Sequence, residues 1–169
     1  AKRGYLPASG LDEAVTSMTT LNSAAASVML SQNVKAATDV TGFGLLGHLG
    51  NMLKASSIAA QTALGANLSY AKIPLFEGVE ALLEQGLCPA GTRRNLETAA
   101  PLTEFSASIS SSHQLLLADA QTSGGLLMAV PEANLEALMT ELKENMVANC
   151  AVVGQVVRAL QPAAIQVGY

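Results

Sequence analysis

Two kinds of short apolar segment alternate along this chain, and their alternation limits the folds that the chain can adopt. Some segments repeat apolar residues at helical spacing, whereas others are compact apolar runs bounded by glycine or proline, as strands are. At 169 residues the chain has the length of one ordinary domain with its own core. Because helix-type and strand-type segments interleave, the sequence favours an α/β or α+β sandwich with helices on a mixed sheet.

The periodicity predicts the following elements. Helices are expected over residues 9–32, 45–56, 76–85 and 131–145. Strands are expected over residues 35–40, 58–64, 125–130, 151–157 and 164–167, with a turn at 65–67 after the second strand. Gly86 is placed to end the third helix. Residues 87–112 contain two prolines and a serine-rich tract, which predicts a loop with short helices.

The charge content is unusually low and excludes two classes of protein. Charged residues make up 13% of the chain, against about 25% in a typical soluble domain. The surface is therefore either completed by uncharged polar residues or includes a face that packs against something else. Nine Lys and Arg are outnumbered by thirteen Asp and Glu, which disfavours a nucleic-acid-binding protein. An apolar content of 50% excludes a disordered chain.

Neither a membrane span nor a cysteine-based site is predicted. No apolar run approaches the length of about 18 residues that a membrane-spanning helix needs. Cys88 and Cys150 are too few and too far apart to suggest a disulfide framework or a zinc site. Neither has a nearby His or Lys that would mark it as a nucleophile. We expect a cytoplasmic protein with two reduced thiols.

The segment from Gly42 to Gly47 matches the G-x-G-x-x-G pattern of dinucleotide-binding folds but fails in its context. That pattern needs an acidic residue about 20 positions later to bind the ribose hydroxyls. No Asp or Glu occurs between Asp39 and Glu77, and no Arg is present there to bind a 2′-phosphate. The pattern is also not a P-loop, because no Lys-Ser or Lys-Thr follows the glycine. A Rossmann-type domain is therefore not expected.

A more general interpretation of this segment concerns anions and a metal ion. A glycine-rich turn leading into a helix presents backbone N–H groups to an anion. Asp39 lies three residues upstream, and magnesium is typically held by carboxylates together with phosphate oxygens and water. Asp39 and this turn would together form a binding site for a metal ion and a phosphate group. The alternative is that Asp39 caps the turn or the helix and that the glycines only permit close packing.

A second glycine-rich segment runs from Asp119 to Leu127. Thr122 and Ser123 offer hydroxyl groups, and the two glycines after them precede an apolar strand. This pattern suits a close approach of the backbone to a ligand, but it suits a bulge or a sharp entry into a strand equally well.

Four further polar residues are weaker candidates. His48 is expected on a helix surface or packed, and His113 has no metal-binding partner at a recognised spacing. Arg93 and Arg94 follow Thr92, a possible N-cap, and are either solvated or reach an anion.

Taken together, three segments resemble the C-terminal half of selenophosphate synthetase (selenide, water dikinase). They are residues 37–48 (ATDVTGFGLLGH), 91–95 (GTRRN) and 119–127 (DAQTSGGLL), and the first and third are the specific ones. The wider superfamily, which includes aminoimidazole ribonucleotide synthetase, varies in both. The similarity runs across nearly the whole chain.

The resemblance implies a fold, a domain organisation and a reaction. The expected fold is α+β: the layered α/β/α sandwich with a mixed sheet of the C-terminal domain in this superfamily, partly ferredoxin-like. Family members are ATP-dependent phosphotransferases that convert selenide, ATP and water into selenophosphate, AMP and phosphate with Mg²⁺, for selenocysteine and selenouridine synthesis. Their N-terminal domain supplies most ATP contacts and the reactive Cys or selenocysteine, and nothing like it is present here. Residues 1–169 are thus expected to be a single C-terminal domain, and the full-length protein a homodimer.

The resemblance also assigns candidate site residues. Asp39 matches an aspartate that helps to bind Mg²⁺. Thr41, Gly42 and Gly44 match a loop that faces the active site between the domains. The segment Thr122, Ser123, Gly124 and Gly125 matches a signature that shapes this cleft or holds an anion. No catalytic nucleophile can be assigned.

One conclusion follows from charge alone. Magnesium-assisted phosphate chemistry needs several ligands, and Asp39 supplies a single carboxylate. The chain alone is therefore expected to bind Mg-ATP poorly and to be inactive. The alternative is a free-standing, non-catalytic module of the same fold that binds an anion or a partner protein.

Overall fold

The computed structural model describes residues 8–169 and consists of helices and short strands in alternation. The helices are α1 (Ala8–Thr19), α2 (Ser23–Ser31), α3 (Gly44–Ala60), α4 (Val79–Glu84), α5 (Ala90–Ala99), α6 (Ser111–Leu117) and α7 (Glu132–Glu144), with short 3-10 turns η1 (Tyr70–Lys72) and η2 (Ala100–Leu102). The strands are β1 (Ala36–Asp39), β2 (Leu64–Ser69), β3 (Thr103–Phe105), β4 (Leu126–Ala129), β5 (Gly154–Arg158) and β6 (Ile165–Gly168).

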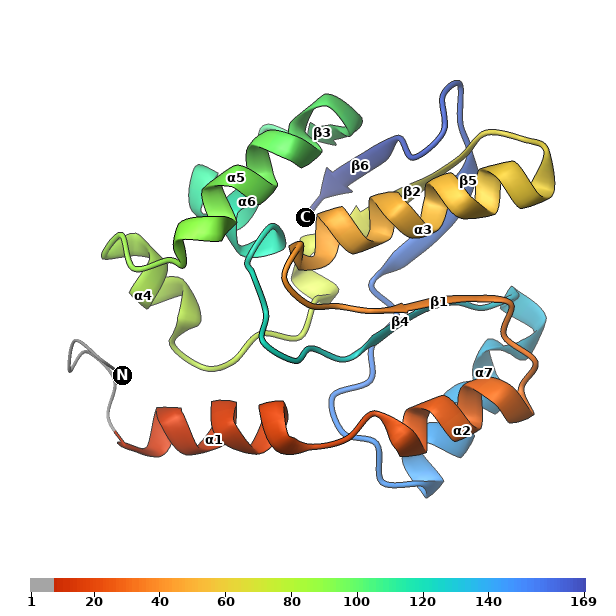
Figure 1. The fold of residues 1–169 in the computed structure, drawn as a ribbon, viewed down its shortest axis with the longest axis horizontal. Coiled ribbons are helices and arrows are strands. Elements are labelled where there is room, and N and C mark those ends of the chain that lie inside the picture. The colour runs from red at the N-terminus through yellow and green to blue at the C-terminus, as the bar shows by residue number, and fades with distance from the viewer. Residues whose placement is uncertain (1–7) are drawn as a thin grey trace.

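The strands form two separate sheets. One is an antiparallel pair of β1 and β4, and the other is a four-stranded sheet in the order β3-β6-β2-β5. In the larger sheet β6 runs parallel to both β2 and β3, while β5 is antiparallel to β2, so the sheet is mixed. In Figure 1, α3 crosses in front of this sheet, and β1 and β4 run side by side below the helix. The expected α+β class with a mixed sheet is confirmed.

The main core lies between α3 and the four-stranded sheet. Its buried side chains come from α3, β2, β6, α5 and α6, and include Leu46, Leu49, Leu53, Leu68, Ala99, Leu117, Ile165 and Val167. Burying each such aliphatic side chain contributes about 1.5–3 kcal/mol. The opposite face of the sheet is polar, because Glu104, Gln166, Asn67 and Gln155 are exposed and adjacent in register.

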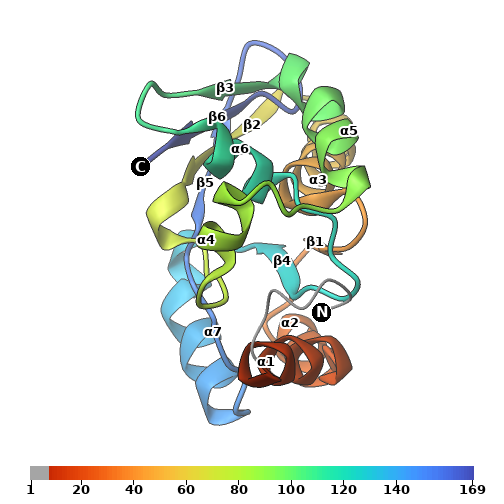
Figure 2. The same ribbon diagram turned by 90° about the vertical axis from the view of Figure 1, so that its left-hand side faces the viewer.

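The β1–β4 pair lies between helices on both sides, which gives an α/β/α layering. Leu127 and Ala129 of β4 pack against the core under α3, whereas Leu126 and Met128 pack against a second cluster. That second cluster is built from α2 and α7, with Val28, Leu138 and Leu142 buried at its centre. Figure 2 shows these two helices at one end of the molecule and the four-stranded sheet at the other. The alternating side chains of β4 thus join the two cores.

The expected helix over residues 9–32 is wrong in one respect, since the chain forms two helices, α1 and α2, with a break between them. The hydroxyl of Thr20 donates to the carbonyl of Thr16 at 2.7 Å, at the end of α1. Asn22 donates its side-chain amide to the carbonyl of Gly124 at 3.1 Å. A contact with a distant segment therefore outweighs the local apolar periodicity at the break.

The expected strand over residues 58–64 and turn at 65–67 are also wrong. Ile58 continues α3 and is 80% exposed, and Gln61 ends the helix in the left-handed conformation. The strand is Leu64–Ser69, in which Ala66 and Leu68 face the core and Asn67 faces solvent. Buried Ser57 joins the two elements, because its hydroxyl donates to the carbonyl of Leu53 and accepts the N–H of Leu64.

The remaining predictions agree with the structure more closely, except that residues 87–112, expected to be a loop with short helices, also contain the strand β3, which pairs with β6. The strands expected at 35–40, 125–130, 151–157 and 164–167 correspond to β1, β4, β5 and β6, and the helix at 131–145 to α7. The helix expected over 76–85 is shorter, since Gly78 is in the left-handed conformation and α4 begins after it. Gly86, also left-handed, follows the end of α4 as expected. No helix among residues 8–169 is long and apolar enough to span a membrane.

Candidate functional site

The two glycine-rich segments lie side by side. Asp39 at the end of β1 pairs with Leu126 at the start of β4, so the segments that flank these residues run together. Beyond the strands, Gly124 N–H donates to the carbonyl of Val40 at 2.9 Å. Gln121 N–H then donates to the carbonyl of Thr41 at 3.2 Å. Residues 41–44, here called the first loop, are therefore held against residues 119–125, the second loop.

Two glycines are required by this close packing. Gly44 has φ +68°, and a Cβ there would lie 2.5 Å from the carbonyl carbon of Ala118. A Cβ on Gly124 would lie 2.3 Å from the carbonyl oxygen of Val40. At these two positions the packing alternative left open by the sequence accounts for the glycine.

The other two candidate glycines are not explained by packing. Gly42 and Gly125 are exposed, and a Cβ at either position would meet no atom within 4 Å. Neither has a positive φ. Their open surroundings leave room for another molecule to approach the backbone.

The third motif, residues 91–95, joins both loops through α5. The Asn95 side-chain amide donates to the carbonyl of Gly42 at 2.8 Å and to that of Ala118 at 3.1 Å. The expectation that Thr92 is an N-cap is wrong, because Pro89 precedes the helix and Thr92 is fully buried. The Thr92 hydroxyl instead donates to the carboxylate of Asp119 at 2.9 Å. All three motifs thus meet at one place.

Asp119 is a half-buried carboxylate whose two oxygens both have donors. One oxygen accepts from Thr92, and the other accepts from the side-chain amide of Gln121 at 2.7 Å. Burial raises the pKa of Asp119 above its usual value, and the hydrogen bonds from Thr92, Gln121 and the Ala120 N–H oppose that effect in part. Asp119 therefore connects residues within the site through both of its carboxylate oxygens.

The raised pKa of Asp119 predicts a pH-dependent contribution to stability. A pKa that is higher in the folded state means that the folded state binds this proton more tightly than the unfolded state does. The resulting contribution of Asp119 to the stability of the folded state is complete at pH values below the ordinary pKa of aspartate. It is lost as the pH rises through the raised pKa of the folded state. In urea unfolding between about pH 7 and about pH 4, the wild type should gain stability relative to Asp119→Asn as the pH falls. If the stability of the wild type minus that of Asp119→Asn stayed constant, or increased as the pH rose, the result would contradict this prediction.

The side chain of Asp39 does not cap the turn or α3 in the described part of the chain. Its side chain is exposed, and within residues 8–169 its carboxylate takes part in no hydrogen bond or ion pair. Phe43 occupies the N-cap position of α3 without a side-chain hydrogen bond. In the described part of the chain, no group of three His, Cys, Asp or Glu residues could hold a metal ion. Within residues 8–169, the Asp39 carboxylate beside the two loops is therefore without a partner.

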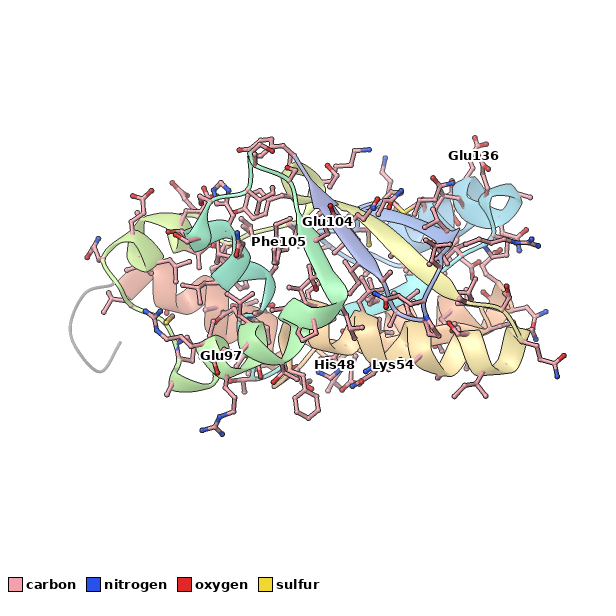
Figure 3. All side chains as sticks on the ribbon, turned by 90° about the horizontal axis from the view of Figure 1, so that it is seen from above. His48, Lys54, Glu97, Glu104, Phe105 and Glu136 are labelled. Carbon is pink, nitrogen blue, oxygen red and sulfur yellow. The ribbon has the colours of Figure 1, made fainter. Side chains whose placement is uncertain are left out.

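His48 contacts the first loop, a role that the sequence did not indicate. Its Nε2 lies 3.1 Å from the hydroxyl of Thr41, and its ring lies 5.5 Å from the ring of Phe43. Figure 3 shows His48 on the side of α3 that faces away from the four-stranded sheet. A possible signal was its position one helical turn after Gly44, on the same face as the loop.

The other weak candidates lie outside this arrangement. Arg93 and Arg94 are exposed on α5. His113 stacks on Tyr70 with ring centroids 4.1 Å apart, and its Nε2 lies 3.5 Å from a carboxylate oxygen of Glu80.

Both cysteines are free and half-buried. Burial raises the pKa of the Cys150 thiol, which favours the unreactive protonated form.

Comparison with known proteins agrees with the three motifs. The model of the family described as AIR synthase related protein, C-terminal domain, matches residues 4–164. A protein named selenide, water dikinase from Carboxydothermus hydrogenoformans is 41% identical over 143 residues, which are 85% of this chain and 40% of that protein. Proteins of the same name from Pseudomonas aeruginosa and Pelobacter propionicus are 44% and 36% identical, over 81% and 92% of this chain.

The chain spans about two fifths of the length of these relatives, since it covers 40%, 38% and 43% of them. The resemblance to selenophosphate synthetase stated from the motifs is confirmed by these similarities. The family match extends across both glycine loops, α5 and the two cores except for the last strand, β6. The chain therefore belongs to the family of the C-terminal domain of AIR synthase related proteins.

Proposed function

We propose that residues 1–169 are the C-terminal domain of a two-domain selenide, water dikinase, an enzyme that converts selenide, ATP and water into selenophosphate, AMP and phosphate. The observation that carries this proposal is the meeting of three family motifs beside the free carboxylate of Asp39. The names of the relatives support the reaction, and their greater length supports a further domain. Under this proposal the active site lies between the two domains.

Asp39 is the residue that would hold Mg²⁺ in this site. An exposed carboxylate without another partner suits an ion that prefers carboxylate, phosphate and water oxygens. Bound Mg²⁺ would neutralise charge on the phosphate oxygens. Because residues 8–169 contain no group of three His, Cys, Asp or Glu residues that could hold a metal ion, the remaining protein ligands would come from the N-terminal domain.

The two loops would line the phosphate and substrate cleft. Thr41 and Ser123 bring hydroxyl groups to it, and Thr122 is exposed next to them. Gly42 and Gly125 leave the backbone accessible, while Gly44 and Gly124 keep the two loops in contact. Phe43 is 59% exposed at the start of α3 and would meet the N-terminal domain. From the family resemblance we further propose that the partners are this ATP-binding domain, ATP and selenide, and that the full-length protein is a cytoplasmic homodimer.

The test compares the chain alone with the complete polypeptide that contains it. We expect selenide-dependent AMP formation from the complete polypeptide and none from the chain alone. Calorimetry of the chain alone with Mg-ATP should show weak binding or none, because most ligands of the nucleotide are missing. Micromolar binding by the chain alone would contradict the proposed division of the site. A complete polypeptide that forms no AMP with selenide would contradict the function itself.

A further inference from the structure

The side-chain amide of Asn95 on α5 contacts both the first loop and the residue that precedes the second loop. Its two N–H groups are directed to the carbonyls of Gly42 and Ala118, at 2.8 and 3.1 Å. Gly42 belongs to the first loop, and Ala118 immediately precedes the second. The Asn95 side chain is half-buried, and its donors are both engaged. It therefore links two segments that are far apart in the sequence.

This contact determines the orientation of a peptide group in the first loop. Peptide bonds in the described residues are trans, and in a trans peptide the C=O and N–H groups point in opposite directions. With the Gly42 carbonyl directed at Asn95, the N–H of Phe43 points away from α5. The N–H of Gly44 also donates to the carbonyl of Thr41 at 2.9 Å, which closes a turn around the Gly42–Phe43 peptide. The Asn95 hydrogen bond adds to this turn a restraint from a distant element, which acts on the carbonyl of the peptide itself.

A second contact from α5 strengthens the link. Thr92 lies three residues before Asn95, so both side chains project from the same face of the helix. The buried Thr92 hydroxyl donates to Asp119 and accepts the N–H of Ala120 at 3.3 Å. The start of the second loop is therefore held to α5 at two points. Among the side-chain hydrogen bonds of α5 within residues 8–169, that of Asn95 to Gly42 extends the attachment to the first loop, in addition to the direct backbone bond from Gln121 to Thr41.

We propose that Asn95 is a positioning residue of the site, which holds the Gly42 carbonyl against α5, directs the Phe43 N–H to the opposite side and makes the two loops move as one unit. The ligand that this N–H would meet is a phosphate group, and that identification rests on the proposed function. The coupling of the loops does not rest on it. Asn95 itself touches no substrate in this proposal and acts through the backbone.

The experiment that tests the coupling is amide hydrogen exchange of the chain, measured by NMR for Asn95→Asp. Aspartate has the shape of asparagine but brings oxygens, in place of N–H donors, to the two carbonyls. We expect exchange at the Gln121 and Gly124 amides, whose acceptors are in or next to the first loop, to accelerate by about tenfold or more, as expected for the loss of a hydrogen bond. Amides that join β2 to β5 should be unchanged. Exchange that stays at the wild-type rate at Gln121 and Gly124 would overturn the proposal.

Two further variants separate positioning from a general loss of stability. Thr98→Ala removes a hydroxyl from the same helix that bonds only to the carbonyl of Arg94, and it should leave both loops unaffected. Asn95→Ala removes the donors without adding charge, and keeps the test valid if Asn95→Asp fails to fold. It should accelerate exchange at the same two amides. Uniform acceleration across the whole chain in Asn95→Ala would indicate a structural role only and would overturn positioning.

Kinetics of the complete polypeptide supply an independent readout. Because most ATP contacts are assigned to the other domain, Asn95→Asp should lower kcat for AMP formation by about tenfold or more while KM for ATP changes less than about threefold. A rise in KM with unchanged kcat would overturn the positioning role. If the wild-type polypeptide forms no AMP, the proposed function fails, and the exchange experiment still decides the coupling.

Discussion

Replacing Gly44 with alanine should lower the free energy of unfolding by about 2–5 kcal/mol, the combined cost of a left-handed residue with a side chain and of overpacking. Gly44 has φ +68°. Its Cβ would lie 2.5 Å from the carbonyl carbon and 2.6 Å from the carbonyl oxygen of Ala118, and 2.9 Å from that of Asp119. All three neighbours are backbone atoms, which cannot move aside by changing rotamer. The variant must therefore separate the two loops or distort the start of α3.

The matched control for this prediction is Gly50→Ala in the same helix. Gly50 is buried in α3, but a Cβ there would meet no atom within 4 Å. Alanine in a helix interior is favoured over glycine by about 0.5–1 kcal/mol, so this variant should be as stable as the wild type or more stable. Urea unfolding of the three proteins measures both effects. A Gly44→Ala protein as stable as the wild type would show that the two loops are not packed as described.

The elements that could be predicted from sequence are those whose signals are local. Residues 131–145 begin with Pro-Glu and repeat apolar residues at helical spacing, and they form α7. The strand predictions that became β1 and β4 rested on short apolar segments next to glycine. Because these signals do not depend on the remainder of the chain, the elements that they predict are present in the folded structure.

The failed predictions depend on contacts with distant residues. Residues 20–22 break a helix because Asn22 contacts Gly124, about a hundred positions later. The β-branched Ile58 was assigned to a strand, but burial decides the preference of such a residue, and Ile58 is exposed on α3. Gly65 was assigned to a turn because glycine is common there, whereas it lies inside β2 between its neighbours β5 and β6.

The same distinction applies to the site. Asp39 and the glycines of the two loops could be selected as candidates from short motifs. The roles of Asn95, Thr92 and His48 could not, because each acts by a side-chain contact that requires the folded chain. The contacts of Tyr70 and His113 with Glu80 likewise could not be predicted from the sequence, because they require the folded chain.

Asp39→Asn should reduce selenide-dependent AMP formation by the complete polypeptide by about 100-fold or more, since loss of a metal-binding carboxylate costs at least as much as loss of a supporting residue. Asparagine keeps the size of the side chain and removes its charge. Because the Asp39 carboxylate makes no hydrogen bond within residues 8–169, the stability of the chain should change by less than about 0.5 kcal/mol. The loss is thus expected to be specific to Mg²⁺, and raising the Mg²⁺ concentration should recover part of the activity.

Glu136→Gln on α7 is the matched control for Asp39→Asn at the end of β1, because it removes the same charge at an exposed position on a different element. Both variants change the net charge of the chain equally, so any general electrostatic effect on ATP or selenide should appear in both. Only Asp39→Asn should change the Mg²⁺ concentration needed for half-maximal AMP formation. Equal activity in the two variants would mean that Asp39 does not bind the metal ion, and the Mg²⁺ ligands would then all have to come from the N-terminal domain.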